Sequence, residues 1–247
     1  MARPSKTDRY REVLRKTAPE HRQRYLRENS HLPGPRGNLE LVWAAAEELS
    51  PSEIHQCAAS GDEFLTVCGA VGLGRLCAEG DDDAERLLHD LAADSRWRVR
   101  EGAAMALQRL GDTDREAMLG LAEAWTRDSS LLVRRAAVAG VCEPRLLDAS
   151  WIVSRVLAML DAATSSIAEA DGARRRTEEF RVLRQALGYC WSVAVAAAPD
   201  SAFSRFEDCA RSADADVRWI VRQNLKKARL IRAGPDRART LAHLLED

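Results

Sequence analysis

Aromatic residues are scarce in this sequence and make up only 5% of its 247 residues. Alternating runs rich in valine or threonine, the pattern of half-buried β-strands, are also rare. Alanine and aliphatic residues dominate instead, and the chain is long enough to bury a sizeable core. The composition therefore gives β-structure little support and argues against disorder of the whole chain.

Motifs that would hold a metal or a cofactor are absent as well. The cysteines form no Cys-x-x-Cys pair, the five histidines are scattered, and a zinc site needs clustered ligands. The run Gly69-x-x-Gly72-x-Gly74 lies inside a predicted helix rather than after a strand, so it indicates close helix packing rather than a phosphate loop. We expect no cofactor, no metal site and no catalytic residues. The cysteines are expected to be buried free thiols: Cys57, Cys68, Cys77, Cys142, Cys190 and Cys209.

No apolar run approaches the ~18 residues of a membrane span, and the N-terminus shows no signal peptide. These absences predict a cytoplasmic protein with no membrane partner. Lysine is nearly absent, since almost all basic residues are arginine. Together with the abundant alanine, this bias is typical of a GC-rich bacterial genome.

Caps and breakers divide the chain into helices. Two prolines and two glycines make residues 29–37 a loop, after which Asn38 can cap a helix through about Leu49. Ser50-Pro51-Ser52-Glu53 is a capping box with proline in the first turn. Gly61 and Gly80 bracket a long helix, and Pro235 to Leu245 is expected to form a short terminal helix.

A repeat begins at Asp81. Apolar residues spaced for one helix face run to Leu91, and a second such helix follows a turn and is closed by Gly111. The turn aspartate and the Val-Arg pair of this hairpin (Asp94, Val99-Arg100) recur 34 residues later (Asp128, Val133-Arg134). Fixed self-similarity at this period predicts stacked helical hairpins.

Two further copies follow with the same period. Leu183-Arg184 and Val217-Arg218 are again 34 residues apart, but 50 residues separate Val133 from Leu183. We therefore expect an insertion around residues 164–176. The predicted fold is an all-α, right-handed α-solenoid of about five helical hairpins. Residues 1–37 would form an N-terminal helical cap and loop, and residues 38–247 one continuous repeat array with a basic terminal helix.

These repeats resemble the HEAT-repeat family. In that family a turn aspartate precedes a Val-Arg pair and an Ala-Ala-x-x-Leu-like run, as in residues 94–107 here and, less closely, in residues 128–141 and 216–227. The resemblance covers residues 81–231 well. It implies a non-catalytic binding or scaffold module that holds a macromolecular partner on a concave face lined by second helices.

The chain also resembles, more distantly, the AlkD-like DNA glycosylases, which are HEAT-like and grip DNA. That resemblance implies the alternative function, a DNA-binding protein related to alkylation repair; if the protein is an enzyme, it would be a DNA glycosylase. The matching segment is Ser95 to Glu101. Trp97 is present there, but an arginine stands where the family has its catalytic carboxylate, and Glu101 belongs to the helical repeat.

Candidate binding residues come from the repeats. The repeated arginines could form a charge ladder for a partner, or could bind turn aspartates and carbonyls within the fold. Arginines outside the repeat pattern are better candidates for partner contact. Trp97 and Trp219 could stack on a base or pack between repeats. The candidates are Arg96, Trp97, Arg98, Arg100, Arg134, Arg135, Arg184, Arg218, Trp219, Arg222 and Lys226.

Both ends of the chain are basic. Residues 3–27 hold nine Lys/Arg against three acids, and residues 218–239 hold eight against Asp236 alone. Such clusters can engage phosphate, or can be the solvated caps that repeat arrays need. We expect a monomer whose partner is a protein or the backbone of DNA.

Overall fold

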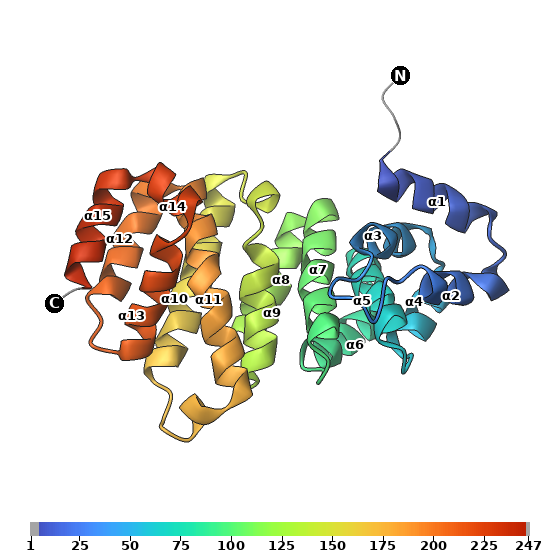
Figure 1. Cartoon of the computed structure of the whole chain (residues 1–247), viewed down its shortest axis with the longest axis horizontal. Coiled ribbons are helices and arrows are strands. Elements are labelled where there is room, and N and C mark those ends of the chain that lie inside the picture. The colour runs from blue at the N-terminus through green and yellow to red at the C-terminus, as the bar shows by residue number, and fades with distance from the viewer. Residues whose placement is uncertain (1–4, 246–247) are drawn as a thin grey trace. The chain divides into compact units, whose positions relative to one another are not determined.

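The computed structural model describes residues 5–245 and shows two compact units, residues 1–114 (unit 1) and residues 115–247 (unit 2) (Figure 1). The described residues form fifteen α-helices and two short 3-10 turns, without a β-strand. Both units are built from helical hairpins, and the fold is an all-α solenoid, as predicted. The predicted boundary between a cap over residues 1–37 and one array over residues 38–247 stays a prediction.

Unit 1 contains seven helices. Second helices of successive hairpins pack on one another, α3 on α5 and α5 on α7, while α4 and α6 cover α5 from the other layer. The helices are α1 (Lys6–Lys16), α2 (Pro19–Glu28), α3 (Leu39–Glu48), α4 (Pro51–Ala58), α5 (Glu63–Ala78), α6 (Asp82–Ala92) and α7 (Trp97–Thr113).

The predicted caps of unit 1 are confirmed. The Asn38 side chain accepts a hydrogen bond from the backbone N–H of Leu41 and starts α3. Ser50 and Glu53 form the reciprocal capping box of α4. One prediction is wrong: Gly111 does not close α7, which continues to Thr113, because Asp114 is the first residue to leave the helical conformation.

The glycines of α5 allow helices to approach closely, as the sequence predicted. A Cβ on Gly69 would lie 2.2 Å from the backbone nitrogen of Ala58 on α4. A Cβ on Gly74 would lie 2.1 Å from the carbonyl oxygen of Ala106 on α7. Only a residue without a side chain fits such backbone contacts, so these two glycines set the spacing of the α4, α5 and α7 layers.

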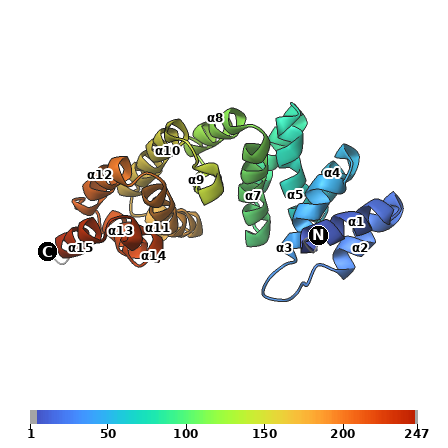
Figure 2. The ribbon, with the colours of Figure 1, turned by 90° about the horizontal axis from the view of Figure 1, so that it is seen from above.

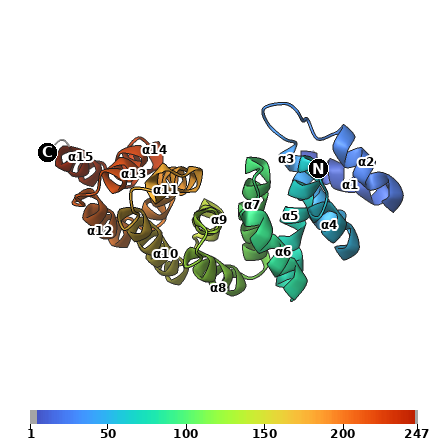
Figure 3. The ribbon, with the colours of Figure 1, turned by 90° about the horizontal axis from the view of Figure 1, so that it is seen from below.

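Unit 2 contains eight helices in two rows. Figures 2 and 3 show first helices α8, α10 and α12 in one row and second helices α9, α11 and α13 in the other, beside α14. The helices are α8 (Arg115–Thr126), α9 (Leu131–Val141), α10 (Ser150–Ala168), α11 (Glu178–Ala197), α12 (Pro199–Ala210), α13 (Ala215–Leu225), α14 (Ala228–Ala233) and α15 (Pro235–Leu244); the 3-10 turns are η1 (Pro144–Leu146) and η2 (Arg174–Arg176).

The insertion lies partly elsewhere than predicted. Helix α10 continues through Ala168, so only residues 169–177 form the irregular connection, which includes η2. The other extra residues lie before α10, in the η1 connection, and within α10 and α11, which are longer than α8 and α9. Longer helices preserve the apolar pattern, and the sequence signal for an insertion is therefore strongest where arginines interrupt it.

Helix α10 is long and apolar enough to cross a membrane by length and composition, which the sequence analysis did not expect. Half of this stretch is buried within the structure. The core helix of a water-soluble protein passes the same test, so this one helix is weak evidence for a membrane span.

A buried asparagine joins the second helices of unit 2. Asn224 on α13 donates hydrogen bonds to the carbonyls of Leu187 (2.9 Å) and Ile220 (2.8 Å), and accepts one from the backbone N–H of Ser192 (2.8 Å). Its side chain is fully buried. A buried amide with its polar groups satisfied fixes the relative position of two helices, here α11 and α13.

The cysteines are free, as expected, but two are only partly buried. Cys57, Cys68, Cys142 and Cys190 lie in the core, whereas Cys77 and Cys209 are half-buried. Burial raises the pKa of the Cys57 thiol to about 12, so this sulfur is protonated and unreactive at neutral pH.

Candidate binding surface on the second helices of unit 2

Charge is distributed differently over the two rows of helices in unit 2. The second-helix row, taken as α9, α11 and residues 215–233, holds ten Lys/Arg and three acids. The acids all lie in the first turns of α11 and α13, and they are Glu178, Glu179 and Asp216. The first helices α8, α10 and α12 hold three arginines and six acids. One row is therefore strongly positive while the other is acidic.

Two repeated arginines are structural. Arg100 is almost fully buried, and its guanidinium donates to the carbonyls of Asp94 (2.7 Å) and Ser95 (2.9 Å). Arg134 donates to the carbonyl of Asp128 in the equivalent turn of the next repeat. Burial, reinforced by neighbouring Arg174, lowers the pKa of Arg134. These two arginines stabilise the turns between helices. Of the two roles that the sequence allowed, they therefore have the structural one, hydrogen bonding to carbonyls within the fold.

The third repeated arginine belongs to an ion-pair network with the insertion. Arg184 pairs with Asp216 at the start of α13, and its guanidinium lies 4.4 Å from the ring centroid of Trp219. Arg175 of η2 donates to Asp216 and to Asp214, each at 2.6 Å. The irregular connection is thereby fastened to α13, a role for Arg175 that the sequence analysis missed because its partners lie about 40 residues away.

The candidates of unit 1 also make internal contacts. Arg96 donates to the Asp94 carboxylate and to the carbonyl of Gly61, and its hydrogen bonds lower the pKa of Asp94. Arg98 pairs with Glu63 at 3.1 Å and stacks on Trp97, whose side chain is 53% exposed. Partner contact at these residues stays a prediction, although both arginines are engaged in holding turns and helices of unit 1.

The remaining candidates lie near the C-terminal end of α13. Arg218 and Arg222 both donate to the carbonyl of Leu245, at 3.1 and 3.3 Å. Lys226 is exposed and contacts only the side-chain oxygen of Gln223 at 3.4 Å. Arg135 on α9 is half-buried and has a partner within the structure.

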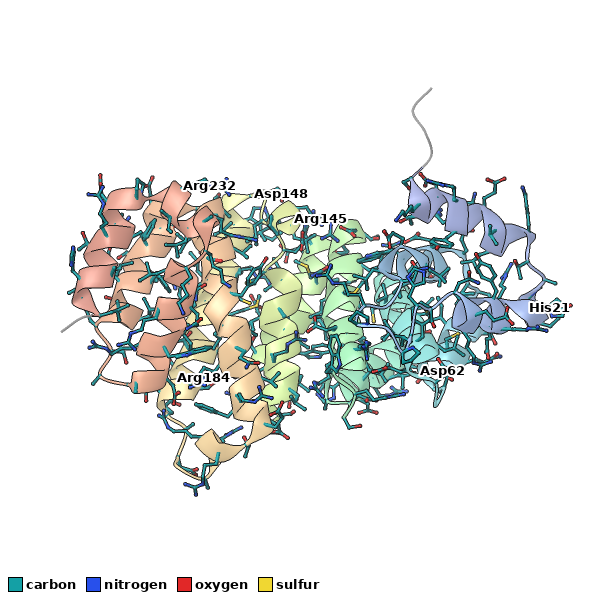
Figure 4. All side chains as sticks on the ribbon, in the orientation of Figure 1. His21, Asp62, Arg145, Asp148, Arg184 and Arg232 are labelled. Carbon is teal, nitrogen blue, oxygen red and sulfur yellow. The ribbon has the colours of Figure 1, made fainter. Side chains whose placement is uncertain are left out.

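A basic cluster surrounds the end of α13 and all of α14. We define it as Arg222, Lys226, Lys227, Arg229 and Arg232. Within residues 5–245, no carboxylate pairs with any of these five side chains. Figure 4 labels Arg184 and Arg232, which lie toward opposite ends of the second helices of unit 2. Counting residues in the sequence found these charges, but it could not show that the five side chains have no carboxylate partner.

An exposed aromatic ring lies in the cluster. Tyr189 on α11 is 40% exposed, and its ring centroid lies 4.9 Å from the Arg229 guanidinium carbon and 5.7 Å from the Lys227 ammonium. Two cations of the cluster, Arg222 and Lys226, line a pocket of about 290 Å³ against α15. The other residues of this pocket are Leu225, Ala242 and Leu245. Tyr189 was not among the predicted site residues, because it lies nearly 40 residues before the cations that it contacts.

Clusters of metal-binding side chains do not occur in the described part of the chain: no group of three or more His, Cys, Asp or Glu is placed to hold an ion. The arrangement on α11, α13 and α14 offers positive charge, an aromatic ring and an apolar pocket. It can attract and hold an anionic chain, with an affinity that falls as salt rises.

Comparison with known proteins identifies the repeats. The fold defines a repeat protein of the α-solenoid class, and residues 68–142 match the model of the family HEAT repeats. The predicted HEAT repeats are therefore confirmed over residues 68–142, and such repeats suggest a binding scaffold. No curated protein matches this chain.

Solved structures that match this chain include engineered repeat proteins. One engineered protein is 15% identical, with 94% of this chain and 98% of that chain covered at a TM-score of 0.37. A designed armadillo repeat protein, solved in complex with the peptide (KR)4, is 14% identical, with 90% and 99% covered at a TM-score of 0.37.

Proposed function

We propose that this protein is a non-catalytic HEAT-repeat binding module that holds an anionic macromolecule on the second helices of unit 2. The observation that carries the proposal is the basic cluster, five cations without a carboxylate partner among residues 5–245. Most other cations among residues 5–245 pair with carboxylates, whereas this cluster keeps its charge available to a partner. We further propose that this surface belongs to the concave face of the solenoid.

The compartment is part of the same proposal. All six cysteines are free thiols. Free thiols persist in a reducing environment, which supports a cytoplasmic protein. A partner in that compartment would be either nucleic acid or an acidic segment of another protein, and binding experiments can separate these two classes.

The proposal is tested with three fluorescent polyanions of matched length: a single-stranded oligonucleotide, a duplex and a polyglutamate peptide. Fluorescence anisotropy is measured from about 50 to about 200 mM salt, a range over which phosphate binding weakens strongly. We expect at least one probe to bind at low salt. The cluster variant Lys226→Gln, Lys227→Gln, Arg229→Gln should bind about tenfold or more weakly, with a shallower salt dependence.

A charge-matched variant controls for net charge. Arg24→Gln, Arg86→Gln and Arg211→Gln remove three exposed cations that each pair locally with a carboxylate. This variant should bind like the parent protein. If no probe binds at low salt, or if the two variants lose affinity equally, the proposed function is wrong. Because the cluster cations make no ion pairs, their removal should leave the melting temperature unchanged or slightly raised.

A further inference from the structure

Local helix electrostatics do not explain why cations gather around α14. A helix end with free carbonyls favours cations, which accounts for Lys226 at the C-terminus of α13. Lys227, however, is the residue that precedes α14, and Arg229 lies in its first turn, where the helix dipole repels positive charge. The two cations therefore lie where the fold disfavours them, next to further like charges and without a carboxylate between residues 217 and 234.

The ring of Tyr189 is the second unusual feature of this place. It is a large side chain of the second-helix row that remains 40% exposed, and both nearest cations lie within cation–π distance of it. Elsewhere in the cluster, Arg222 and Lys226 lie one helical turn apart and line the pocket of about 290 Å³. The other side chains of this pocket, Leu225, Ala242 and Leu245, are apolar.

We propose that the basic cluster and Tyr189 bind single-stranded nucleic acid, with phosphates on the cations and a base against Tyr189 or in the pocket lined by Arg222 and Lys226. The inference rests on the proposed function and names its ligand. A nucleotide unit has both a charged phosphate and a flat apolar base, and the cluster offers a partner for each. Carboxylates of an acidic peptide would use the cations and leave the ring and pocket without a role. In a duplex the faces of the bases are stacked inside and cannot reach a ring on a helix surface.

The surface is suited to a strand in an extended form. Cations at position 222 of α13 and at position 226, just after its end, continue into positions 227, 229 and 232 around α14, so positive charge follows a path along the chain. Flexible lysine and arginine side chains can follow a backbone without reading its sequence. We therefore expect binding that tolerates different base sequences.

Tyr189 provides the sharpest test. Tyr189→Leu removes the ring, and we expect it to weaken binding of the single strand about tenfold, because one base stack is worth about that much. Its salt dependence should stay unchanged, since no charge is lost. Tyr189→Phe keeps the ring and should bind like the parent. Trp151→Leu is the matched control, because Trp151 is 44% exposed but lies at the start of first helix α10.

The outcomes separate the two proposals. We expect the single strand to bind more tightly than the duplex and polyglutamate. This comparison is measured on the parent protein alone. If polyglutamate or the duplex binds at least as tightly, or if Tyr189→Leu and Trp151→Leu bind alike, the inference is wrong while the proposed function stands. If no polyanion binds, both are wrong. Thermal melting of Tyr189→Leu and Tyr189→Phe checks that each variant is folded.

Discussion

The two ends of the chain are both rich in arginine and lysine, yet they use these charges differently. In unit 1, Arg11 and Arg15 both bind Glu48 of α3, and Arg22 binds Glu53 of α4. These pairs fasten α1 and α2 to the helices that follow. Arg3 lies outside the described residues. The basic N-terminus is therefore mainly structural, and its charge is compensated within the unit.

In unit 2 Arg237 binds Glu207, but the five cations of the basic cluster have no carboxylate partner among residues 5–245. The second helices of unit 1 hold six acids and four arginines, whereas the second-helix row of unit 2 holds three acids and ten cations. Similar counts of basic residues at the two ends of the chain, nine and eight, thus describe different surfaces. A basic segment indicates a binding site only when the fold leaves its cations without carboxylates.

The units also differ in how their second helices meet. In unit 1, α5 and α7 touch backbone to backbone at Gly74, while in unit 2 α11 and α13 meet through the side chains of Asn224, Trp219 and Gln223. Backbone contact leaves no room for adjustment, whereas side chains can move. We expect substitutions at the unit 1 contact to cost more stability.

Gly74→Ala should have the largest effect. Its Cβ would lie 2.1 Å from the Ala106 carbonyl oxygen, so α5 and α7 must move apart, and we expect a loss of about 3 kcal/mol or more in the free energy of unfolding. Gly188→Ala, in unit 2, meets only side-chain atoms of Gln223 and Trp219 at 3.1 and 3.2 Å, and should cost about 1 kcal/mol. Urea unfolding followed by circular dichroism measures both.

The control is Gly120→Ala in α8, where a Cβ would meet nothing within 4 Å. It should stabilise the protein by about 0.5–1 kcal/mol, because alanine favours helices over glycine. A Gly74→Ala protein as stable as Gly120→Ala would contradict the backbone contact between α5 and α7, and would remove this difference between the units.

Asn224→Leu tests the side-chain junction of unit 2. The substitution leaves the Ser192 N–H and the Leu187 carbonyl buried without their partner, and we expect a loss of about 2–3 kcal/mol. Asn224→Asp keeps the acceptor for Ser192 but loses the donor to Leu187, and it would also bury a charge, so it should not restore stability. A stable Asn224→Leu protein would mean that apolar packing alone joins α11 to α13.

Local signals made much of the fold predictable from the sequence. These signals act over short distances or repeat along the chain: the capping box at Ser50, the cap at Asn38 and the 34-residue spacing of Val99 and Val133. Close packing at Gly74 was also predictable, because glycine inside an apolar helix has few other uses. The ends of α7 and α10 were not, since both helices continue past the residues that the sequence marks as breaks.

The candidate site was only partly predictable. Its charge was visible in the sequence, but the compensation of charge depends on partners far along the chain, such as Glu48 for Arg15. Tyr189 joins Lys227 and Arg229 only because α14 packs on α11. A pattern within one helix carries no information about such a contact, so the aromatic part of the site required the structure.

The smallest effect is expected at a repeat turn. The Asp94 carboxylate accepts hydrogen bonds from the backbone N–H of Arg96 at 2.7 Å and from its guanidinium, and these bonds lower the pKa of Asp94 below its usual 3.8. Asp94→Asn should cost about 1 kcal/mol at neutral pH. In unit 2 the turn residue Asp214 binds Arg175 of the insertion, whereas the Asp94–Arg96 pair lies within one turn.

The pH dependence of Asp94→Asn distinguishes this charge effect from packing. A carboxyl whose native pKa is depressed stabilises the fold above its unfolded pKa, and that stabilisation is lost as pH falls through the native value. The difference between the parent and Asp94→Asn should therefore be full at neutral pH and shrink below pH 3.8. Urea midpoints across this range measure it, and a constant difference would show that Asp94 acts through shape and not through its charge.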